Sequence, residues 1–225
     1  MTKIQFTFAM AGLMVAMATV IVLSNVLVQY PLSGTFAGIS LGDLLTWGAF
    51  TFPLAFLVTD FANRAFGVAR ARLVVLVGFA VAVVLSIVFA TPRIAIASGS
   101  AFLIAQLLDV QLFDRLYRVR SNAGETRVAW WTPPAVSSVF GSVVDTALFF
   151  TLAFAAFATP ILGFGDAFAT EAAPLFGVLA VEAPRWVSWA LGDLAVKLIA
   201  IPVLLFPYRL LLVTTGLDAR PGLAA

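Results

Sequence analysis

The sequence predicts an all-α membrane protein, a bundle of about six transmembrane helices that forms one integral membrane domain over residues 1–225. Of the 225 residues 62% are hydrophobic and only 11% are charged, and the mean hydropathy is +1.08. A soluble domain carries roughly 25% charged residues, so this composition excludes a soluble globular protein. Since one crossing takes about 20 apolar residues, the length accommodates about six crossings and no separate soluble domain.

The predicted helices follow from apolar runs and from the residues that interrupt them. No charged residue lies between Lys3 and Asp43, which predicts a long first helix. Ser40 and Asp43 resemble a capping box at the start of a second helix, which Pro53 should kink. The six helices are expected at approximately 6–28, 41–62, 73–91, 93–117, 133–157 and 184–213.

Two later helix starts carry a threonine followed by a proline, a pattern typical of the first helical turn. Thr91-Pro92 predicts the start of the fourth helix and Thr132-Pro133 the start of the fifth. The longest connection, residues 158–183, contains two prolines and three acidic residues. We expect this connection to form a partly helical lid or lip on the outer surface.

The charges predict the orientation of the helices. In the six-helix arrangement ten of the 13 Lys and Arg residues fall on one side, namely Lys3, Arg64, Arg70, Arg72, Arg115, Arg118, Arg120, Arg127, Arg209 and Arg220. Cytoplasmic loops of membrane proteins are enriched in Lys and Arg, so both termini are predicted to be cytoplasmic.

Several classes of function are excluded or disfavoured. The chain has no Cys and no His, so we expect no metal site, no cofactor and no imidazole proton relay. No basic run is dense enough to bind nucleic acid. No phosphate-binding loop with a lysine is present, and we expect no catalytic residues and therefore no enzyme.

Charged and polar residues inside the predicted helices are candidate functional residues, because a charge at the membrane centre is costly. They recur at helical spacing on one face of each of the last three helices. The candidate substrate-binding residues are Phe102, Gln106, Asp109, Ser142, Asp145, Phe149 and Lys197. By helical rise Asp109 and Asp145 lie about 12 and 18 Å from the cytoplasmic helix ends, so one cavity can hold both.

Structural alternatives exist for three of these polar groups. Asp193 and Lys197 are four residues apart, so they can pair within one helix, or Lys197 can face Asp145 or a ligand across the cavity. Only Lys197 or Arg93 could compensate Asp109 and Asp145, which favours a ligand or ion role for the aspartates. Asn25 in the first helix, which is also a candidate substrate-binding residue, could cap a bend or face the same cavity.

Four strings in this order resemble the queuosine precursor transporter family, also called the vitamin uptake transporter family. They are TFPLAFLVTDFANRAFG at 51–67, RIAIAS with QLLDVQLFDRL at 93–98 and 106–116, WWTPPAVSSVFGSVVDTALFF at 130–150, and GDLAVK at 192–197. The resemblance covers approximately residues 25–212. It adds Asp60, Asn63, Arg64, Arg93 and Asp193 as candidate coupling or gating residues.

The resemblance implies a helical bundle similar to the substrate-binding subunits of energy-coupling-factor transporters, located in a bacterial inner membrane. It implies uptake of a queuosine precursor, such as 7-cyano- or 7-aminomethyl-7-deazaguanine, or of queuine or queuosine. A deazaguanine presents an N–H and an exocyclic amine side by side, which one carboxylate can accept, and a flat face on which an aromatic ring can stack.

A solitary secondary transporter is the leading hypothesis, with proton coupling through an aspartate and a homodimer as open options. A substrate-binding subunit that needs a separate ATPase module is the alternative, and a non-transport membrane scaffold is a third. The expected partners are the deazaguanine ligand and the lipid bilayer.

Overall fold

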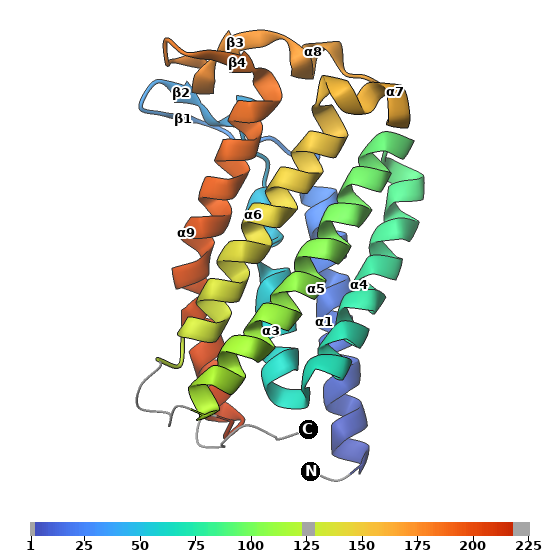
Figure 1. Ribbon diagram of the computed structural model, residues 1–225, viewed down its shortest axis with the longest axis vertical. Coiled ribbons are helices and arrows are strands. Elements are labelled where there is room, and N and C mark those ends of the chain that lie inside the picture. Colours follow the sequence, from blue (N-terminus) through green and yellow to red (C-terminus); the bar gives the residue numbers. More distant parts are fainter. Residues whose placement is uncertain (1–2, 123–128, 218–225) are drawn as a thin grey trace.

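The computed structural model describes residues 3–122 and 129–217. Within these residues five helices are long and apolar enough to cross a membrane: α1 (Lys3–Leu27), α4 (Val68–Phe89), α5 (Pro92–Asn122), α6 (Thr132–Phe154) and α9 (Arg185–Thr214). They stand side by side in one tall bundle (Figure 1). Large apolar side chains cover its outside, including Ile87 and Phe206 at 78% and 77% exposure, as a lipid-facing surface requires. The prediction of an all-α membrane protein is confirmed.

The second predicted helix, 41–62, is not one continuous helix. The chain forms a 3-10 turn, η1 (Leu41–Asp43), then the single-turn helix α2 (Gly48–Thr51) and finally α3 (Leu54–Phe66). The predicted capping box is wrong, because the Ser40 side chain makes no capping hydrogen bond. Pro53 lies between α2 and α3 and lacks the backbone N–H that a continuous helix needs there.

The start of this segment is extended because its backbone pairs with the chain that leaves α1. The amide of Leu32 donates to the carbonyl of Leu45 at 3.0 Å, and that of Trp47 donates to Tyr30 at 3.0 Å. Strand β1 (Thr35–Phe36) pairs with β2 (Ile39–Ser40), so the backbone of Ser40 belongs to a hairpin. These hydrogen bonds replace those of the expected first helical turns. With about 20 Å of helical rise α3 is shorter than a membrane core, so six crossings remain a prediction.

The other long helices lie close to the predicted ranges. The fourth starts at Pro92 as expected, and the Ile94 amide donates to the Thr91 hydroxyl at 3.4 Å. The third begins at Val68, five residues early, because Gly67 makes the turn from α3 with a φ of 79°. The fifth ends at Phe154, before the predicted 157, since Ala155 is extended.

Short elements cover the end of the bundle opposite the described chain ends (Figure 1). They include the hairpin β1–β2 and most of the chain between α6 and α9. The latter comprises η2 (Ala156–Ala158), α7 (Thr159–Leu162), α8 (Ala167–Thr170), β3 (Ala172–Pro174), η3 (Leu175–Gly177) and β4 (Glu182–Pro184). Strands β3 and β4 pair antiparallel. This layer fits the expected partly helical lid.

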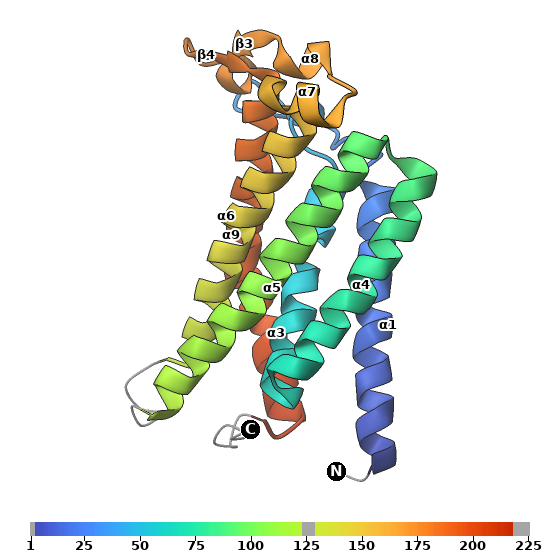
Figure 2. The same ribbon diagram turned by 45° about the vertical axis from the view of Figure 1, so that its right-hand side comes forward.

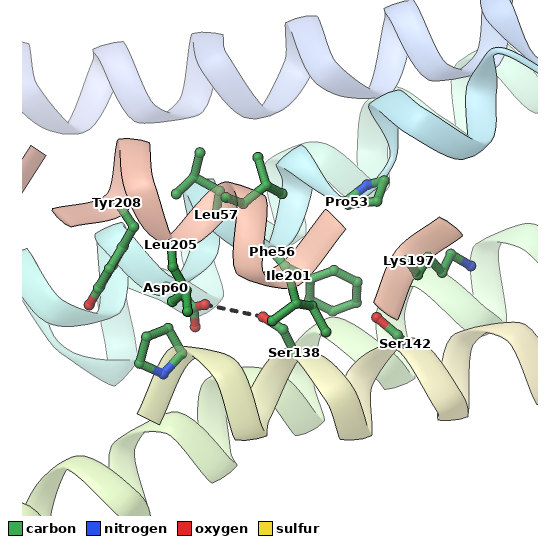
Figure 3. A pocket seen from close by; sticks show the side chains of 12 residues that line it. Pro53, Phe56, Leu57, Asp60, Ser138, Ser142, Lys197, Ile201, Leu205 and Tyr208 are labelled. Atoms are coloured by element: carbon green, nitrogen blue, oxygen red, sulfur yellow. Dashed lines mark hydrogen bonds between the residues drawn. The ribbon is translucent and has the colours of Figure 1, made fainter. Parts of the chain in front are cut away.

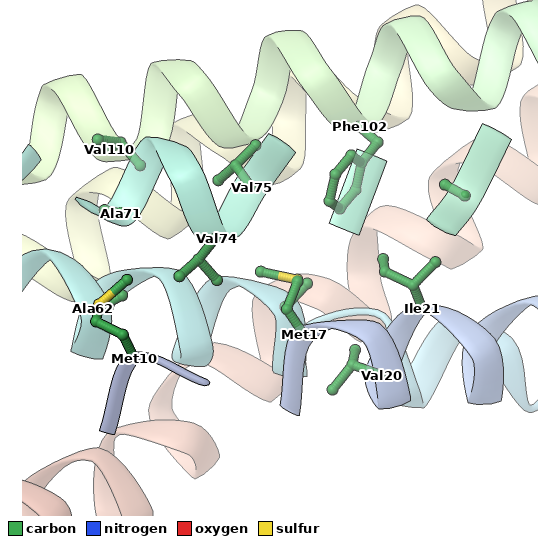
Figure 4. Packing of buried hydrophobic residues seen from close by; sticks show 12 residues of the cluster. Met10, Met17, Val20, Ile21, Ala62, Ala71, Val74, Val75, Phe102 and Val110 are labelled. Atoms are coloured by element: carbon green, nitrogen blue, oxygen red, sulfur yellow. The ribbon is translucent and has the colours of Figure 1, made fainter. Parts of the chain in front are cut away.

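Helix α5 lies between α4 and α6, and Figure 2 shows it crossing the middle of the bundle. Helix α9 packs on α6, α1 packs on α4, and the short α3 contacts α1, α4, α5 and α9. The apolar core fills the α1, α4 and α5 side, where Met17, Val74 and Phe102 are buried (Figure 4). The opposite side of α3, toward α6 and α9, is left for polar residues.

Gly48 is a position at which a single added methyl group should disrupt this packing. A Cβ at Gly48 would lie 2.9 Å from the backbone of Val28 and 3.0 Å from the carbonyl oxygen of Ser24, and backbone cannot move aside cheaply. We expect Gly48→Ala to destabilise the protein by about 1–3 kcal/mol. Thermal unfolding of the purified protein in detergent measures the change.

Gly12 is the matched control. It lies exposed in α1, and a Cβ added there would have no neighbouring atom within 4 Å, so Gly12→Ala should be neutral or stabilising by up to about 1 kcal/mol. Equal melting temperatures for the two variants would contradict the close contact of α2 with α1.

Candidate functional site

A narrow pocket lies between α3, α6 and α9. Its polar lining consists of Asp60, Ser138, Ser142, Lys197 and Tyr208. Figure 3 shows Asp60 and Ser138 at its middle, with Lys197 toward one end and Tyr208 toward the other. The remaining lining is apolar and consists of Pro53, Phe56, Leu57, Pro134, Ile201, Leu204 and Leu205.

Lys197 is the centre of a buried ion cluster that joins α6 to α9. Its ammonium nitrogen lies 2.6 Å from a carboxylate oxygen of Asp145 and 2.5 Å from one of Asp193. It also donates to the hydroxyl of Thr146 at 3.1 Å, and that hydroxyl donates to Asp193 at 2.7 Å. The ring of Phe52, at the break between α2 and α3, lies 5.2 Å from the ammonium group.

The two arrangements that the sequence left open for Lys197 therefore occur together. Lys197 pairs with Asp193 along α9 and with Asp145 across to α6. Asp145 and Lys197 are almost fully buried, so their pairing avoids an uncompensated charge inside the bundle. Two carboxylates share one ammonium group, and Asp193 is the more exposed of them.

A second pair of carboxyl groups lies where α3 meets α5 and α6. Asp60 accepts hydrogen bonds from the hydroxyls of Ser137 and Ser138, both at 3.3 Å. Asp109 is fully buried and close enough to Asp60 for the two carboxyl groups to interact. In the described part of the chain neither carboxylate forms an ion pair with a lysine or arginine.

Helix α3 is held against α5 by two buried hydrogen bonds. The Thr59 hydroxyl donates to Oε1 of Gln106 at 2.6 Å, and the Asn63 side chain donates to the carbonyl of Val110 at 2.8 Å. Gln106 has no exposed surface. The polar face of α3 is therefore divided, with Thr59 and Asn63 toward α5 and Asp60 toward the pocket.

Arg93 lies outside the pocket, at the end of the bundle covered by the short elements. Its guanidinium group donates to the carbonyls of Leu152 at 2.8 Å and Ala155 at 2.7 Å, and to the hydroxyl of Thr159 at 2.9 Å. A longer contact of 3.5 Å reaches the carbonyl of Gly163. Arg93 ties the start of α5 to the connection after α6 and does not compensate Asp109 or Asp145.

Arg64 lies at the opposite end. It donates to the carbonyl of Leu217, and its guanidinium carbon lies 4.7 Å from the centre of the Tyr117 ring. The predicted coupling or gating residues thus lie apart: Asp60 in the pocket, Asp193 in the ion cluster, Arg93 at one end of the bundle and Arg64 at the other. Asn63 joins α3 to α5 beside the pocket.

Six of the eight predicted substrate-binding residues do not line this pocket, and three of the six make their contacts elsewhere. Phe102 belongs to the apolar core, Phe149 packs on Phe150 and Phe154, and the Asn25 side chain donates to the carbonyl of Ile21 within α1. This hydrogen bond of Asn25 stays within its own helix. Of the remaining candidates, Ser142 and Lys197 line the pocket and Asp145 contacts Lys197, while Gln106 and Asp109 lie buried beside it.

Sequence reasoning missed four residues that complete these contacts, namely Phe56, Thr59, Ser137 and Thr146. Phe56 precedes Asp60 by four residues and so shares its helix face, which is a signal that helical spacing could have provided. Thr146 adjoins Asp145 in the sequence, and Ser137 adjoins Ser138. No sequence signal distinguishes these hydroxyl groups from the many others that only satisfy their own helix backbone.

Comparison with known proteins identifies the family. A family model for vitamin uptake transporters matches residues 46–91 and 86–211. The chain belongs to the vitamin uptake transporter family. The match contains every residue of the pocket and of both carboxylate clusters, whereas Asn25 lies before it.

Two curated relatives have more specific names. A "Probable queuosine precursor transporter" of Haemophilus influenzae is 35% identical over 169 residues, which cover 64% of this chain and 68% of the relative. The "Queuosine precursor transporter" of Escherichia coli is 37% identical over 155 residues, which cover 60% of this chain and 64% of that protein. No solved structure gives a significant match. With its apolar helices, this family member is a multi-pass membrane protein.

The ion cluster predicts an unequal effect of its members on stability. Lys197→Met leaves two carboxylates without their cation, so we expect a loss of about 3–5 kcal/mol. Asp145→Asn or Asp193→Asn should cost less, because Lys197 keeps one carboxylate. Combining Asp145→Asn with Lys197→Met should recover part of the loss, as measured by thermal unfolding in detergent.

Arg118→Met is the control, since Arg118 forms an exposed ion pair with Asp114 on the surface of α5. Its expected cost is about 0–1 kcal/mol. A Lys197→Met variant as stable as Arg118→Met would show that the cluster does not hold α6 to α9.

Proposed function

We propose that this chain imports a queuosine precursor as a solitary secondary transporter. The proposed substrate is a 7-deazaguanine base, such as 7-cyano- or 7-aminomethyl-7-deazaguanine, or queuine or queuosine. The observation that carries the proposal is the pocket, which Asp60 and Lys197 line at separate positions inside the bundle of a vitamin uptake transporter. The names of the two relatives support the substrate class.

The pocket is suited to a flat, donor-rich heterocycle. Phe56 and Leu57 offer apolar surface for a ring face, and Ser142 and Lys197 offer polar groups at its edge. We assign Asp109, Asp145, Gln106, Lys197 and Ser142 to substrate binding. Asp145 acts through Lys197, which it holds in place at 2.6 Å.

Asp60 is the proposed coupling residue. Two carboxyl groups that interact inside a membrane protein, with no cation beside them, are costly when both are ionised. Asp60 and Asp109 are such a pair, so we infer that they hold one proton between them. Asp60 lines the pocket, which gives that proton a route to the substrate cavity.

We also propose that both termini are cytoplasmic and that the short elements lie on the outer side. Both described chain ends lie at the same end of the bundle (Figure 1). Arg70 and Arg72 begin α4 at that end, and Arg115 and Arg118 lie in the part of α5 that reaches it. Arg127 and Arg220, which are also among the residues predicted to lie on the cytoplasmic side, are outside the described residues.

Transport by the purified chain alone tests the main proposal. Proteoliposomes that contain only this protein should take up labelled 7-cyano- or 7-aminomethyl-7-deazaguanine with saturable kinetics, faster with an inwardly directed proton gradient. Empty liposomes are the control. Saturable binding without uptake would instead favour a substrate-binding subunit that needs an ATPase module, and absence of both would reject the substrate class.

Asp60→Asn separates coupling from substrate movement. The amide keeps the size of the side chain but cannot release a proton, so gradient-driven accumulation should fall at least about 10-fold. Exchange of external label against preloaded unlabelled substrate needs no net proton movement and should persist. Asp114→Asn, on the surface of α5, should leave both assays unchanged. Full accumulation by Asp60→Asn would reject Asp60 as the coupling residue.

Single cysteines test the orientation in a chain that has no cysteine of its own. Ala129, before α6, and Ala167, in α8, are exposed and lie at opposite ends of the bundle. In intact cells an impermeant thiol reagent should label Ala167→Cys readily and Ala129→Cys only after the membrane is opened. The reverse pattern would place the termini outside. Labelling of both variants in intact cells would reject an odd number of membrane crossings between residues 129 and 167.

A further inference from the structure

Three buried polar atoms on one face of α5 have no hydrogen-bond partner within residues 3–122 and 129–217. They are Nε2 of Gln106 and both carboxylate oxygens, Oδ1 and Oδ2, of Asp109. Ser137 and Asp60 lie near enough to interact with Asp109, but the Ser137 hydroxyl is directed to Asp60 at 3.3 Å. Because a buried polar group without a partner costs free energy, such a group inside a transporter indicates a place where a bound molecule supplies the missing partner.

The three atoms form a defined pattern. Gln106 and Asp109 are three residues apart on α5, so their side chains are neighbours on one helix face. The Thr59 hydroxyl, 2.6 Å from Oε1, fixes the amide and leaves Nε2 as its free end. An amide nitrogen carries two N–H groups, so a free donor also remains if the amide is turned to donate to Thr59. One donor therefore stands beside two acceptors.

We propose that Gln106 and Asp109 together bind the amide edge of a guanine-type ring. That edge presents a carbonyl oxygen, a ring N–H and an exocyclic amine in sequence, which is one acceptor followed by two donors. Gln106 donates to the carbonyl oxygen, and the Asp109 carboxylate accepts from the two N–H groups. An adenine-type edge, which places an amine opposite Gln106 and a bare ring nitrogen opposite Asp109, mismatches at both positions.

Phe56 is the partition between the pocket and this edge site. Its ring lines the pocket (Figure 3), and it also occupies the space beside Gly141. A Cβ at Gly141 would lie 2.6 Å from the Phe56 ring and 3.5 Å from Cβ of Asp109. Phe56 and Asp109 therefore both border Gly141, and the proposal requires the Phe56 ring to move aside so that the pocket reaches Asp109.

This inference rests on the proposed function and gives Gln106 and Asp109 the role of selecting the base. It also links substrate binding to the position of the proton that Asp60 and Asp109 are proposed to share. Asp109 must be ionised to accept two N–H groups, so the proton of the carboxyl pair then resides on Asp60, which lines the pocket.

The test combines changes in the ligand with changes in the protein. Binding to the purified full chain is measured for 7-deazaguanine, for 7-deazahypoxanthine, which lacks the exocyclic amine, and for 7-deaza-6-thioguanine, whose sulfur is a weaker acceptor. In the parent protein loss of the amine should weaken binding about 10-fold or more, and the sulfur several-fold. Asp109→Asn should reduce the amine effect to about threefold or less, and Gln106→Leu should remove the sulfur effect only.

Gln111→Leu and Asp114→Asn are the matched controls, since they make the same changes on the outer surface of α5. Both should retain the full effect of each ligand change. If Asp109→Asn and Gln106→Leu weaken all three ligands by the same factor, the two residues have only a structural role and the inference is wrong. If the parent binds none of the three ligands, the inference and the proposed substrate class fall together.

Discussion

A charge inside a membrane protein must find a partner, and the position of Lys197 determines which charges in this bundle do so. Its single ammonium group takes Asp145 from α6 and Asp193 from α9. Within the described residues Asp60 and Asp109 form no ion pair with a cation, since Arg64 and Arg93 bind backbone carbonyls at the two ends. The α6–α9 side is therefore electrostatically compensated, whereas Asp60 and Asp109 depend on hydroxyl groups, a proton or a ligand.

This division gives α3 a special place in the bundle. It is short and begins just after Pro53, and its residues contact both groups of charges: Phe52, just before it, lies over Lys197, while Asp60 faces Asp109. A change in the charge of the Asp60–Asp109 pair would act directly on α3. If α3 moved in response, the hydrogen bonds that Thr59 and Asn63 make with α5 would either persist or break.

The sequence predicted the long helices and most of the buried charges, because apolar length and helical spacing depend only on local residues. It did not predict the neighbours of the aspartates: Asp109 and Asp145 were expected to share one cavity, and in the structure Asp109 lies beside Asp60 while Asp145 binds Lys197. Helical rise gives the depth of a residue along its helix. It does not give the rotation of the helix about its own axis, which decides the neighbouring helix that the residue faces. The predicted end at 62 instead of Phe66 also placed Asp60 about 6 Å too close to the helix end.

Among the described residues, the two most buried cations show why Arg93 could not have served the aspartates. A guanidinium group has five donors in a plane, which suits the several free carbonyls at the end of a helix, and Arg93 meets those of Leu152 and Ala155 where α6 ends. Lys197 carries a compact ammonium charge with three donors, which Asp145, Asp193 and the Thr146 hydroxyl share in the middle of the bundle. Each cation thus matches its surroundings chemically. Because Arg93 is bound at the end of α6, it forms no ion pair with Asp60 or Asp109, and this is why we propose a shared proton as the neutralising charge of that pair.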